Sequence, residues 1–450
     1  MGSYKSLNNF FISIDAIVLS NLFSIKFWKD LGNIIKTTII KGLIKTKNCW
    51  MKKIHIYTQY YRPVSNAPAN RIEKYVKALK DNYDITIITW MPNYPTWIKD
   101  QRYRWKLFLK ETWPYWEKIV RTYEFATRNE WFFKRTLNYV SFMLSSFIYW
   151  LFATKPDLII VTSPPLFSAI WVLWLNKIRK IPYILEIRDL WPQSVVALWL
   201  MKKESLSYKI FSWFERKIYD NAKRIIVVTK WIQKEIEKMW YDKVVLQYNV
   251  FDWSNLKIFS KKELEDFKNK YNTPGNKKVF VYTWNHSKAQ YLENILNLAK
   301  DYKNWEFYML GDGETKQELE NIAKKDDINN IHFLWFQNKE TVYKFIQIAD
   351  FCITSLDDTP LFEDAIPTKT LEYLAYWKPV IAFLRWDLAN KIEEYQAWIV
   401  YPKYNIKLVE DIEKFNHNPK NSIKLVKDYF SFESFKDNVL NVVNKELWKN

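Results

Sequence analysis

The alternation of short apolar segments with segments of helical spacing most constrains the fold of this 450-residue chain. Apolar runs such as Asp84–Thr89 and Arg224–Thr229 have the length and composition of buried strands. Helical patterns such as Lys230–Met239 follow these runs along the chain. Because strands that alternate with helices form parallel sheets covered on both faces, the sequence predicts an α/β fold of doubly wound sheets.

The alternation occurs in two series, which predicts two doubly wound domains that face each other across a cleft. We expect an N-terminal domain over residues 51–250, a linker over 251–278 and a C-terminal domain over 279–425. Residues 426–450 hold an amphipathic helix that we expect to pack back toward the N-terminal domain. Residues 1–50 lack the pattern, and we interpret them as an upstream extension that is not native.

The segment Asp364–Phe383 combines several features of an anion-binding site. A turn at Pro367 leads into a short predicted helix, Thr368–Tyr376, which places Lys369 and Glu372 on nearly the same face. A helix N-terminus with a nearby lysine can hold phosphates, and a carboxylate one turn later can accept hydrogen bonds from ribose hydroxyls. The alternative is a solvated Lys–Glu ion pair on an exposed helix, which is the usual meaning of this spacing.

Polar residues at the ends of two other predicted strands are further candidates. Gly311 and Asp312 follow a strand pattern, where a glycine lets a ligand approach the backbone, although such a pair more often forms an ordinary turn. Arg188 and Asp189 end another strand pattern on the expected cleft side. Asp189 can instead act as the N-cap of the following helical segment.

The balance of glycine and tryptophan is abnormal. The chain contains 6 Gly and 24 Trp, whereas about 7% glycine, roughly thirty residues, is usual for this length. Trp377 stands at a helix end, and Trp90 and Trp284 follow strand patterns, where glycine is common. We expect that most of the tryptophans are glycines whose UGA codons were read as Trp, with Trp191 genuine. The alternative is a Trp-rich protein with aromatic platforms for sugars.

Composition narrows the class of protein. Hydrophobic and charged contents of 48% and 26% are those of an ordinary globular protein, and two cysteines exclude a disulfide scaffold. The formal charge of +19 suits an anionic partner, although a lysine-rich surface for solubility explains it equally. The four histidines lack metal-ligand spacing, and neither a P-loop nor a dinucleotide fingerprint occurs.

One strongly apolar helical pattern, Asn138–Phe152, follows a basic and aromatic region, residues 99–135, that has no clear period. Its length suits a core helix or a helix that lies in a membrane interface, and it is too short for a span.

From about Ile54 onward the chain resembles the family 4 glycosyltransferases of the GT-B fold. Within them it is most similar to the bacterial branch of colanic-acid and O-antigen biosynthesis, which includes N-acetyl-L-fucosamine transferases. The resemblance is carried by QYYRPVSNAPANRI, TWMPNYPTW, IIVTSPPLFSAI, EIRDLWPQSVVALW, VYTWNHSKAQYLENI, MLGDGE and IPTKTLEYLAYWKPVIA. Glycine stands in this family at the positions of Trp90, Trp97, Trp199, Trp284, Trp335 and Trp377.

The resemblance implies a retaining transfer from a nucleotide sugar, expected to be UDP-linked, which the C-terminal domain binds without a metal or other cofactor. Glu372 would hold the ribose, and Lys288 would supply a cation for the phosphates. Asp364 takes the place of a second family carboxylate, and Asn285 replaces a common arginine. The remaining donor-site candidates are Gly311, Asp312, Ile366, Pro367, Thr368, Lys369, Thr370 and Leu371.

The N-terminal domain would bind the acceptor. We expect Asp189 to position the acceptor hydroxyl or the sugar, with Arg188 beside it. Asn66 and Arg71 in the first loop are candidates for contacts with acceptor or phosphate. The catalytic candidates are therefore Glu372, Asp364 and Asp189.

Three functions remain open. The first is a hexosyltransferase of cell-surface polysaccharide biosynthesis that acts on a lipid-linked or polysaccharide acceptor. It would lie at the cytoplasmic face of the membrane, where residues 99–135 and 138–152 touch anionic lipid. The second is a UDP-sugar epimerase of the same fold. The third is a non-enzymatic binder of anionic ligands; because basic residues are spread along the chain, we expect no nucleic-acid partner.

Overall fold

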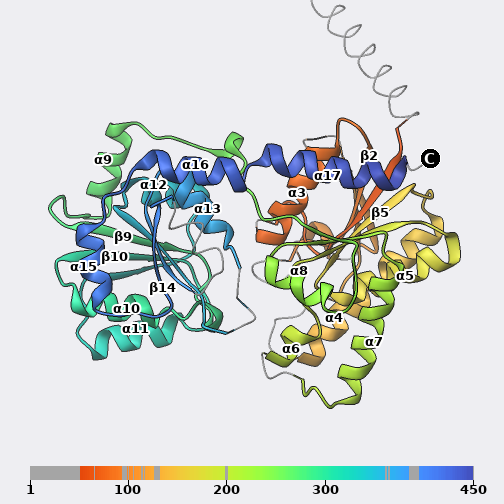
Figure 1. The fold of residues 1–450 in the computed structure, drawn as a ribbon, viewed down its shortest axis with the longest axis horizontal. Coiled ribbons are helices and arrows are strands. Elements are labelled where there is room, and N and C mark those ends of the chain that lie inside the picture. The colour runs from red at the N-terminus through yellow and green to blue at the C-terminus, as the bar shows by residue number, and fades with distance from the viewer. Residues whose placement is uncertain are drawn as a thin grey trace, which may run out of the picture. The chain divides into compact units, whose positions relative to one another are not determined.

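The computed structural model describes most of the chain after residue 50. The described residues are 51–64, 66–93, 99, 101–104, 106–112, 115, 117–125, 132–197, 201–359, 362, 365–384 and 395–448. Two sheets dominate this part of the chain, and helices lie on both faces of each (Figure 1). Two parallel sheets covered by helices agree with the doubly wound α/β fold that the alternating pattern predicts.

The first sheet has eight strands in the order β3-β4-β2-β1-β5-β6-β7-β8. The pairs β2–β4, β1–β5, β5–β6, β6–β7 and β7–β8 are parallel, whereas β3 and β4 pair antiparallel at one edge. The strand bounds are β1 (Lys53–Tyr57), β2 (Asp84–Trp90), β3 (Phe108–Thr112), β4 (Lys118–Thr122), β5 (Leu158–Ser163), β6 (Tyr183–Ile187), β7 (Arg224–Val227) and β8 (Val244–Leu246).

The second sheet has six parallel strands in the order β11-β10-β9-β12-β13-β14. The order reverses direction at β9 and β12, and ligands of such sheets bind at the carboxyl ends of the strands near this point. The strand bounds are β9 (Lys278–Thr283), β10 (Trp305–Leu310), β11 (Ile331–Leu334), β12 (Phe351–Ser355), β13 (Val380–Phe383) and β14 (Trp398–Tyr401).

Helices connect the strands. Those of the first part are α3 (Ala67–Leu79), α4 (Phe132–Phe152), α5 (Leu166–Arg179), α6 (Gln193–Ala197), α7 (Leu206–Asn221) and α8 (Lys230–Glu237), with the 3-10 turn η1 (Gln101–Tyr103). Those of the second part are α9 (Lys261–Lys270), α10 (Glu293–Asp301), α11 (Lys316–Lys325), α12 (Lys339–Ile348), α13 (Thr368–Ala375), α15 (Lys407–Lys414), α16 (Pro419–Tyr429) and α17 (Phe432–Leu447), with η2 (Trp253–Asn255) and η3 (Lys288–Gln290). Helix α17 packs against α3.

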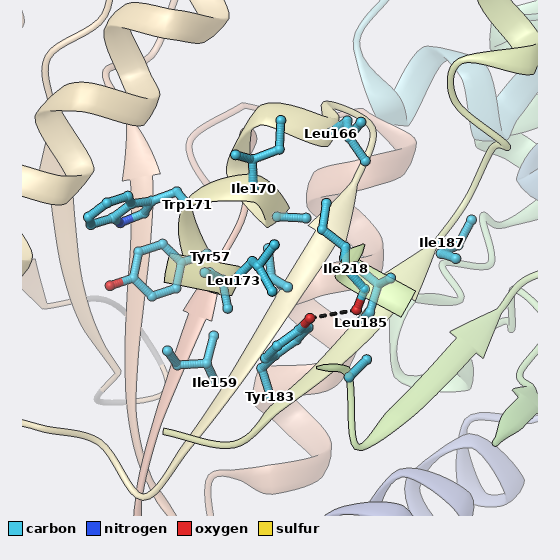
Figure 2. Close-up of a cluster of buried hydrophobic side chains, with 14 of the residues drawn as sticks. Tyr57, Ile159, Leu166, Ile170, Trp171, Leu173, Tyr183, Leu185, Ile187 and Ile218 are labelled. Atoms are coloured by element: carbon cyan, nitrogen blue, oxygen red, sulfur yellow. Dashed lines mark hydrogen bonds between the residues drawn. The ribbon is translucent and has the colours of Figure 1, made fainter. Parts of the chain in front are cut away.

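The core of the first sheet shows why its strands read as continuous apolar runs. Strands β5 and β6 are buried along their whole length, since helices cover both faces. The aromatic residue Tyr183 lies within this core, and its hydroxyl donates a hydrogen bond of 2.5 Å to the carbonyl of Ile218 (Figure 2). A buried phenol is thus satisfied by a helix carbonyl, as buried polar groups require.

Some expected elements differ from those observed. The region 99–135 contains two strands, β3 and β4, that the sequence did not indicate, because β3 alternates exposed and half-buried residues and carries charged side chains. Helix α4 begins at Phe132 rather than Asn138. Helix α3 begins at Ala67, within the expected first loop. Among the described helices, none has the combined length and apolarity of a membrane span.

Candidate functional site

The first turn of α13 lies at the carboxyl edge of the second sheet, where the sequence placed the anion site. Its N-cap is Pro367, whose side chain makes no capping hydrogen bond. The carbonyl of Pro367 accepts a hydrogen bond from Thr370 N at 2.9 Å. Ile366 and Leu371 are buried beside it, and the buried Thr370 hydroxyl has no hydrogen-bond partner among the described residues. Thr368, the first residue of α13, is half-buried.

Lys369 is buried rather than exposed, with 3% of its surface accessible. Its Nζ donates to Gln290 Oε1 at 2.8 Å and lies 4.0 Å from the centre of the Tyr282 ring. Burial without a carboxylate partner holds the pKa of Lys369 well below its usual value. The alternative of a solvated Lys369–Glu372 ion pair is therefore wrong, because the amine is buried against Gln290 and the Tyr282 ring.

Glu372 lies one turn later on α13 and is half-buried. Its carboxylate accepts no hydrogen bond from any residue in the described ranges. Burial raises the pKa of Glu372, and the positive charge of Lys339 partly opposes this rise. A half-buried carboxylate with free acceptor sites is suited to receive hydroxyl donors from a ligand.

Two loops after β9 and β10 hold each other in place beside α13. The main-chain N–H of His286 donates to the carbonyl of Asp312 at 2.9 Å, and Thr315 N donates to the carbonyl of His286 at 3.0 Å. Gly311 has φ of +141°, and a Cβ there would lie 1.8 Å from the carbonyl oxygen of Trp284. Only glycine fits this close approach of the two loops.

The exposed residues of these loops are candidate ligand contacts. Asn285 and Lys288 are exposed after β9, and the main-chain N–H of Lys288 donates to Glu314 at 3.2 Å. Asp312 is exposed, and its side chain accepts from the N–H of Gly313 at 2.9 Å. The chain thus brings Asn285, Lys288, Gly311 and Asp312 to one edge of the second sheet.

His286 and Lys316 are polar residues beneath these loops that the sequence did not single out. His286 is fully buried, and neither ring nitrogen has a hydrogen-bond partner among the described residues. Burial, and secondarily the charge of Lys316, lower the pKa of His286 to about 4. Lys316 is buried 3.6 Å from the centre of the Trp335 ring, and its nearest carboxylate, Glu320, is 3.9 Å away. In the sequence, only the position of His286 close to the end of a predicted strand could have indicated that it belongs to this site.

Two N-terminal candidates serve the fold. Asn66 is the N-cap of α3, and its side chain accepts a hydrogen bond from Ala69 N at 2.9 Å. Arg71 is buried and forms an ion pair with Glu186 at 2.6 Å. It also donates to the carbonyls of Gln247 and Tyr248 at 2.9 and 3.0 Å, and to the Asn249 side chain at 3.2 Å. The donors of Arg71 are thus committed to the protein, and its expected role in phosphate or acceptor binding stays a prediction.

Arg188 and Asp189 follow β6, as expected. Arg188 donates to the carbonyl of Pro164 at 2.9 Å. The Asp189 side chain is exposed, yet the surrounding protein raises its pKa while Arg188 opposes the rise. Water that reaches the exposed carboxylate limits this rise. No hydrogen bond joins this side chain to α6 in the described structure. Asp364 lies outside the described residues.

A surface depression of about 690 Å³ lies elsewhere, between α9 and α12. It shares no residue with the candidate site. Its lining mixes carboxylates with lysines, so it carries no organised charge. We therefore assign the functional site to the loops and helix at the carboxyl edge of the second sheet.

Comparison with known proteins identifies the kind of domain in each part of the chain. Residues 66–247 match the family described as Glycosyl transferase 4-like domain. Residues 263–429 match the family described as Glycosyl transferases group 1. The two matches follow one another along the chain. Each of them contains most of one of the two sheets.

The relatives of this chain share only a low sequence identity with it. The putative colanic acid biosynthesis glycosyl transferase WcaI of Escherichia coli is 24% identical over 334 residues, which cover 72% of this chain and 81% of that protein. The uncharacterized glycosyltransferase MJ1059 of Methanocaldococcus jannaschii is 29% identical over 245 residues, which cover 51% of this chain and 55% of that protein.

Solved structures show the fold. Sucrose-phosphate synthase of Thermosynechococcus elongatus superposes with a TM-score of 0.67 at 13% identity and covers 88% of this chain and 98% of its own. HepE of Anabaena, solved in complex with UDP, gives 0.63 at 12% identity and covers 88% and 100%. WaaG, a glycosyltransferase of lipopolysaccharide biosynthesis, gives 0.60 at 12% identity and covers 86% and 99%.

Proposed function

We propose, for a chain whose two parts match glycosyltransferase domains, that it is a retaining family 4 hexosyltransferase. It would move a sugar from a UDP-sugar to a lipid-linked or polysaccharide acceptor in cell-surface polysaccharide biosynthesis. The relative named for colanic acid biosynthesis supports this pathway class. The solved complexes of HepE with UDP and with UDP-glucose support a uridine nucleotide as the donor carrier.

The observation that carries the proposal is the set of unpartnered polar groups around α13. The Glu372 carboxylate accepts no hydrogen bond from the described residues, and the Thr370 hydroxyl is buried without a partner. A half-buried carboxylate with open acceptor sites, next to a buried hydroxyl without a partner among the described residues, supports a ligand site at the start of α13. A nucleoside diphosphate offers ribose hydroxyls to Glu372 and phosphate oxygens to the α13 N-terminus.

The same arrangement suits the chemistry of transfer. When the bond between the sugar C1 and the diphosphate breaks, negative charge grows on the departing phosphate. Donors that are already fixed in place stabilise this charge without reorganisation. We assign this role to the first-turn N–H groups of α13, to Lys369 and to Lys288. The acceptor oxygen bonds to C1 and its hydroxyl proton is released, with exposed Asp189 as the candidate that orients the hydroxyl.

The test is calorimetric titration of UDP into the protein and its Glu372→Gln variant. Loss of the ribose acceptor is expected to weaken binding by roughly tenfold or more, since a hydrogen bond to a charged group contributes about 1.5–3 kcal/mol. Glu410→Gln is the matched control, because Glu410 lies exposed on α15 in a surface ion pair with Lys414. If Glu372→Gln binds UDP as tightly as the control Glu410→Gln does, the assignment of Glu372 is contradicted.

A transfer assay with UDP-sugars decides the reaction class. The proposed enzyme gives product only when an acceptor is present. Consumption of the UDP-sugar with inversion of a ring carbon, in the absence of acceptor, would instead identify an epimerase. No binding of UDP at all would overturn the proposal as a whole.

We further propose that tryptophan at several turns stands for glycine. Trp240, Trp284 and Trp377 have φ values of 69°, 131° and 60°, which are conformations that favour glycine. Trp377 follows α13, and the neighbouring N–H of Lys378 donates to Tyr373 O at 3.0 Å, which is the usual glycine-ended helix closure. Trp90 does not fit this pattern, because it is a buried strand residue without positive φ.

Peptide mass spectrometry of the protein from its native host tests this proposal at positions 284 and 377. Glycine at both positions supports recoding and leaves the donor loops free of indole rings. Tryptophan at both positions would contradict it. Trp191 is the internal control, since its ring packs against Phe167 and Phe211 at centroid distances of 5.9 and 4.6 Å and is expected to be genuine.

A further inference from the structure

The side chain of Gln290 joins helix α13 to the loop after β9. Gln290 is the last residue of η3, the 3-10 turn of that loop. Its Oε1 accepts a hydrogen bond of 2.8 Å from Lys369 Nζ and lies 3.1 Å from the Tyr282 hydroxyl oxygen. Because an ammonium group can only donate, the amide must present its oxygen to Lys369. Gln290 and Lys369 therefore fix each other's orientation.

Within the described residues, the amine of Lys369 contacts only neutral groups. These are the Gln290 amide and the Tyr282 ring, whose centre lies 4.0 Å from Nζ. Burial raises the pKa of Tyr282 well above its usual value, so the phenol carries no charge near neutral pH. Glu372, one turn along α13, forms no ion pair with Lys369 in this part of the chain. The amine thus lacks an anion that would offset its burial, and a bound phosphate would supply one.

The same amide oxygen is linked to the exposed residues of the loop. The Tyr282 hydroxyl oxygen, beside Oε1, also lies 2.9 Å from the carbonyl oxygen of Asn285. The main-chain N–H of Gln290 donates to the carbonyl of Ser287 at 2.9 Å and closes the turn that contains Lys288. Helix α13 and the loop that carries two donor-site candidates are therefore held together through one neutral side chain.

We propose that Gln290 is a positioning residue for donor binding, which holds the Lys369 amine in place and leaves it available to a diphosphate. The inference rests on the proposed function for the identity of the ligand, and it assigns the role of Gln290 to the neutrality of its side chain. A glutamate of the same shape would pair with Lys369 in the absence of ligand. The folded protein would then be better paired by itself and would bind an anion less well.

Gln290→Glu tests the neutrality of the side chain with almost no change of shape. Calorimetric titration with UDP and with inorganic pyrophosphate measures the binding of the nucleotide and of the diphosphate alone. Both affinities are expected to fall by roughly tenfold to a hundredfold, since the introduced carboxylate competes with phosphate for Lys369. The midpoint of thermal unfolding is expected to stay the same or to rise, because a buried lone cation gains an anionic partner.

Gln290→Met removes the hydrogen-bond acceptor without adding a charge. The Lys369 amine would then lose the one hydrogen bond that it makes within the described structure, so the unfolding midpoint and the UDP affinity are both expected to fall. The two variants should therefore differ in stability although both weaken binding. If Gln290→Glu and Gln290→Met destabilise the protein equally, Gln290 serves only the fold and the proposal is overturned.

Gln317→Glu is the matched control. It adds the same charge at an exposed position of α11, whose first residue is the buried Lys316. The side chain of Gln317 donates to Asn321 at 3.3 Å on the protein surface. The UDP affinity of this variant is expected to differ from that of the wild type by no more than about twofold, because water screens an exposed charge.

Carbon-13 NMR of the lysine Cε atoms reports the protonation of Lys369 directly. The resonance that Lys369→Met removes identifies the residue. Burial lowers the pKa of Lys369 in the wild type, and the carboxylate introduced by Gln290→Glu is expected to raise it. The resonance should therefore titrate at a higher pH in Gln290→Glu and at the wild-type pH in Gln317→Glu. A purely structural side chain would not produce this difference.

The outcomes separate this inference from the proposed function. Weaker binding of UDP and pyrophosphate by Gln290→Glu, with normal binding by Gln317→Glu, supports the positioning role. Wild-type affinity in Gln290→Glu, or an unchanged titration of Lys369, would overturn that role and leave the proposed function intact. If the wild type binds pyrophosphate but not UDP, and Gln290→Glu binds neither, the positioning role stands and the nucleotide donor fails. If the wild type binds neither ligand, both proposals fail.

Discussion

Buried basic residues beside the two sheets differ in their partners. Beside the first sheet, Arg71 is buried with Glu186 and with three further acceptors, so that all of its donor nitrogens have partners. Beside the second sheet, Lys369 is buried against a neutral amide, and the ring of His286 is buried without any partner in the described structure. A buried group with matched partners serves the fold, whereas buried groups without them point to a missing ligand.

The contrast has consequences for stability. Glu186 is fully buried, and removing its cation would leave an uncompensated charge in the core of the first sheet. Near the second sheet the folded protein already buries basic groups that have no anionic partner, and this burial lowers its stability. Substitutions should therefore destabilise the first region and leave the second unharmed, while only the second should affect ligand binding.

The largest expected effect is that of Arg71→Met. It should lower the free energy of unfolding by about 3–5 kcal/mol, because Glu186 would remain buried and unpaired. Urea unfolding at neutral pH measures the change. Lys268→Met is the control, since it removes a surface ion pair with Glu265 that contributes at most about 1 kcal/mol. A loss in Arg71→Met no greater than in the control would remove the structural role assigned to Arg71.

The next effect concerns acid stability and His286. Its pKa is about 4 in the folded protein, whereas an unfolded histidine has a pKa of about 6.5. Between these values the unfolded chain binds a proton that the native state does not, so stability falls as the pH falls from about 6.5 to 4. At about 1.4 kcal/mol for each pKa difference of one, the loss reaches roughly 3 kcal/mol.

Urea unfolding of His286→Gln at several pH values checks this expectation. Glutamine keeps a polar side chain but cannot be protonated, so the variant should lose less stability than the wild type over the same pH range. Other acid-sensitive groups act on both proteins alike, and the difference between the two slopes isolates His286. Parallel slopes would show that the imidazole is solvated or already paired.

These contrasts also show what the sequence could reveal. Most strands of both sheets were predictable because they read as apolar runs. The charged strands β3 and β4 and the short, half-buried β8 were not. The edge of the second sheet was predictable because its loops, Gly311 and α13 are local features. The buried ion pair of Arg71 was not predictable, because Glu186 lies 115 residues away in the sequence and only the folded chain brings the two together.

A smaller effect, with opposite signs for stability and binding, is expected for Lys369→Met. Removing a buried amine that lacks a carboxylate partner should leave the free energy of unfolding unchanged or raise it by about 1 kcal/mol. UDP affinity should fall by roughly tenfold to a hundredfold, since a charge-assisted contact with phosphate is lost. Thermal unfolding measures the change in stability, and UDP calorimetry measures the change in affinity. A variant that unfolds more easily and binds UDP normally would place Lys369 with Arg71 among the structural residues.

The smallest effect is that of Asn66→Ala. Asn66 accepts a hydrogen bond from Ala69 N at the start of α3, and loss of such a cap costs about 1 kcal/mol. Asn66→Asp should retain stability, because aspartate is an equally good N-cap. Neither change should alter turnover with a UDP-sugar and acceptor, since the side-chain oxygen is already committed to the helix. If Asn66→Asp keeps the stability of the wild type but loses transfer, Asn66 contacts substrate through its amide nitrogen, and the separation between a structural first region and a ligand-binding second region fails at that residue.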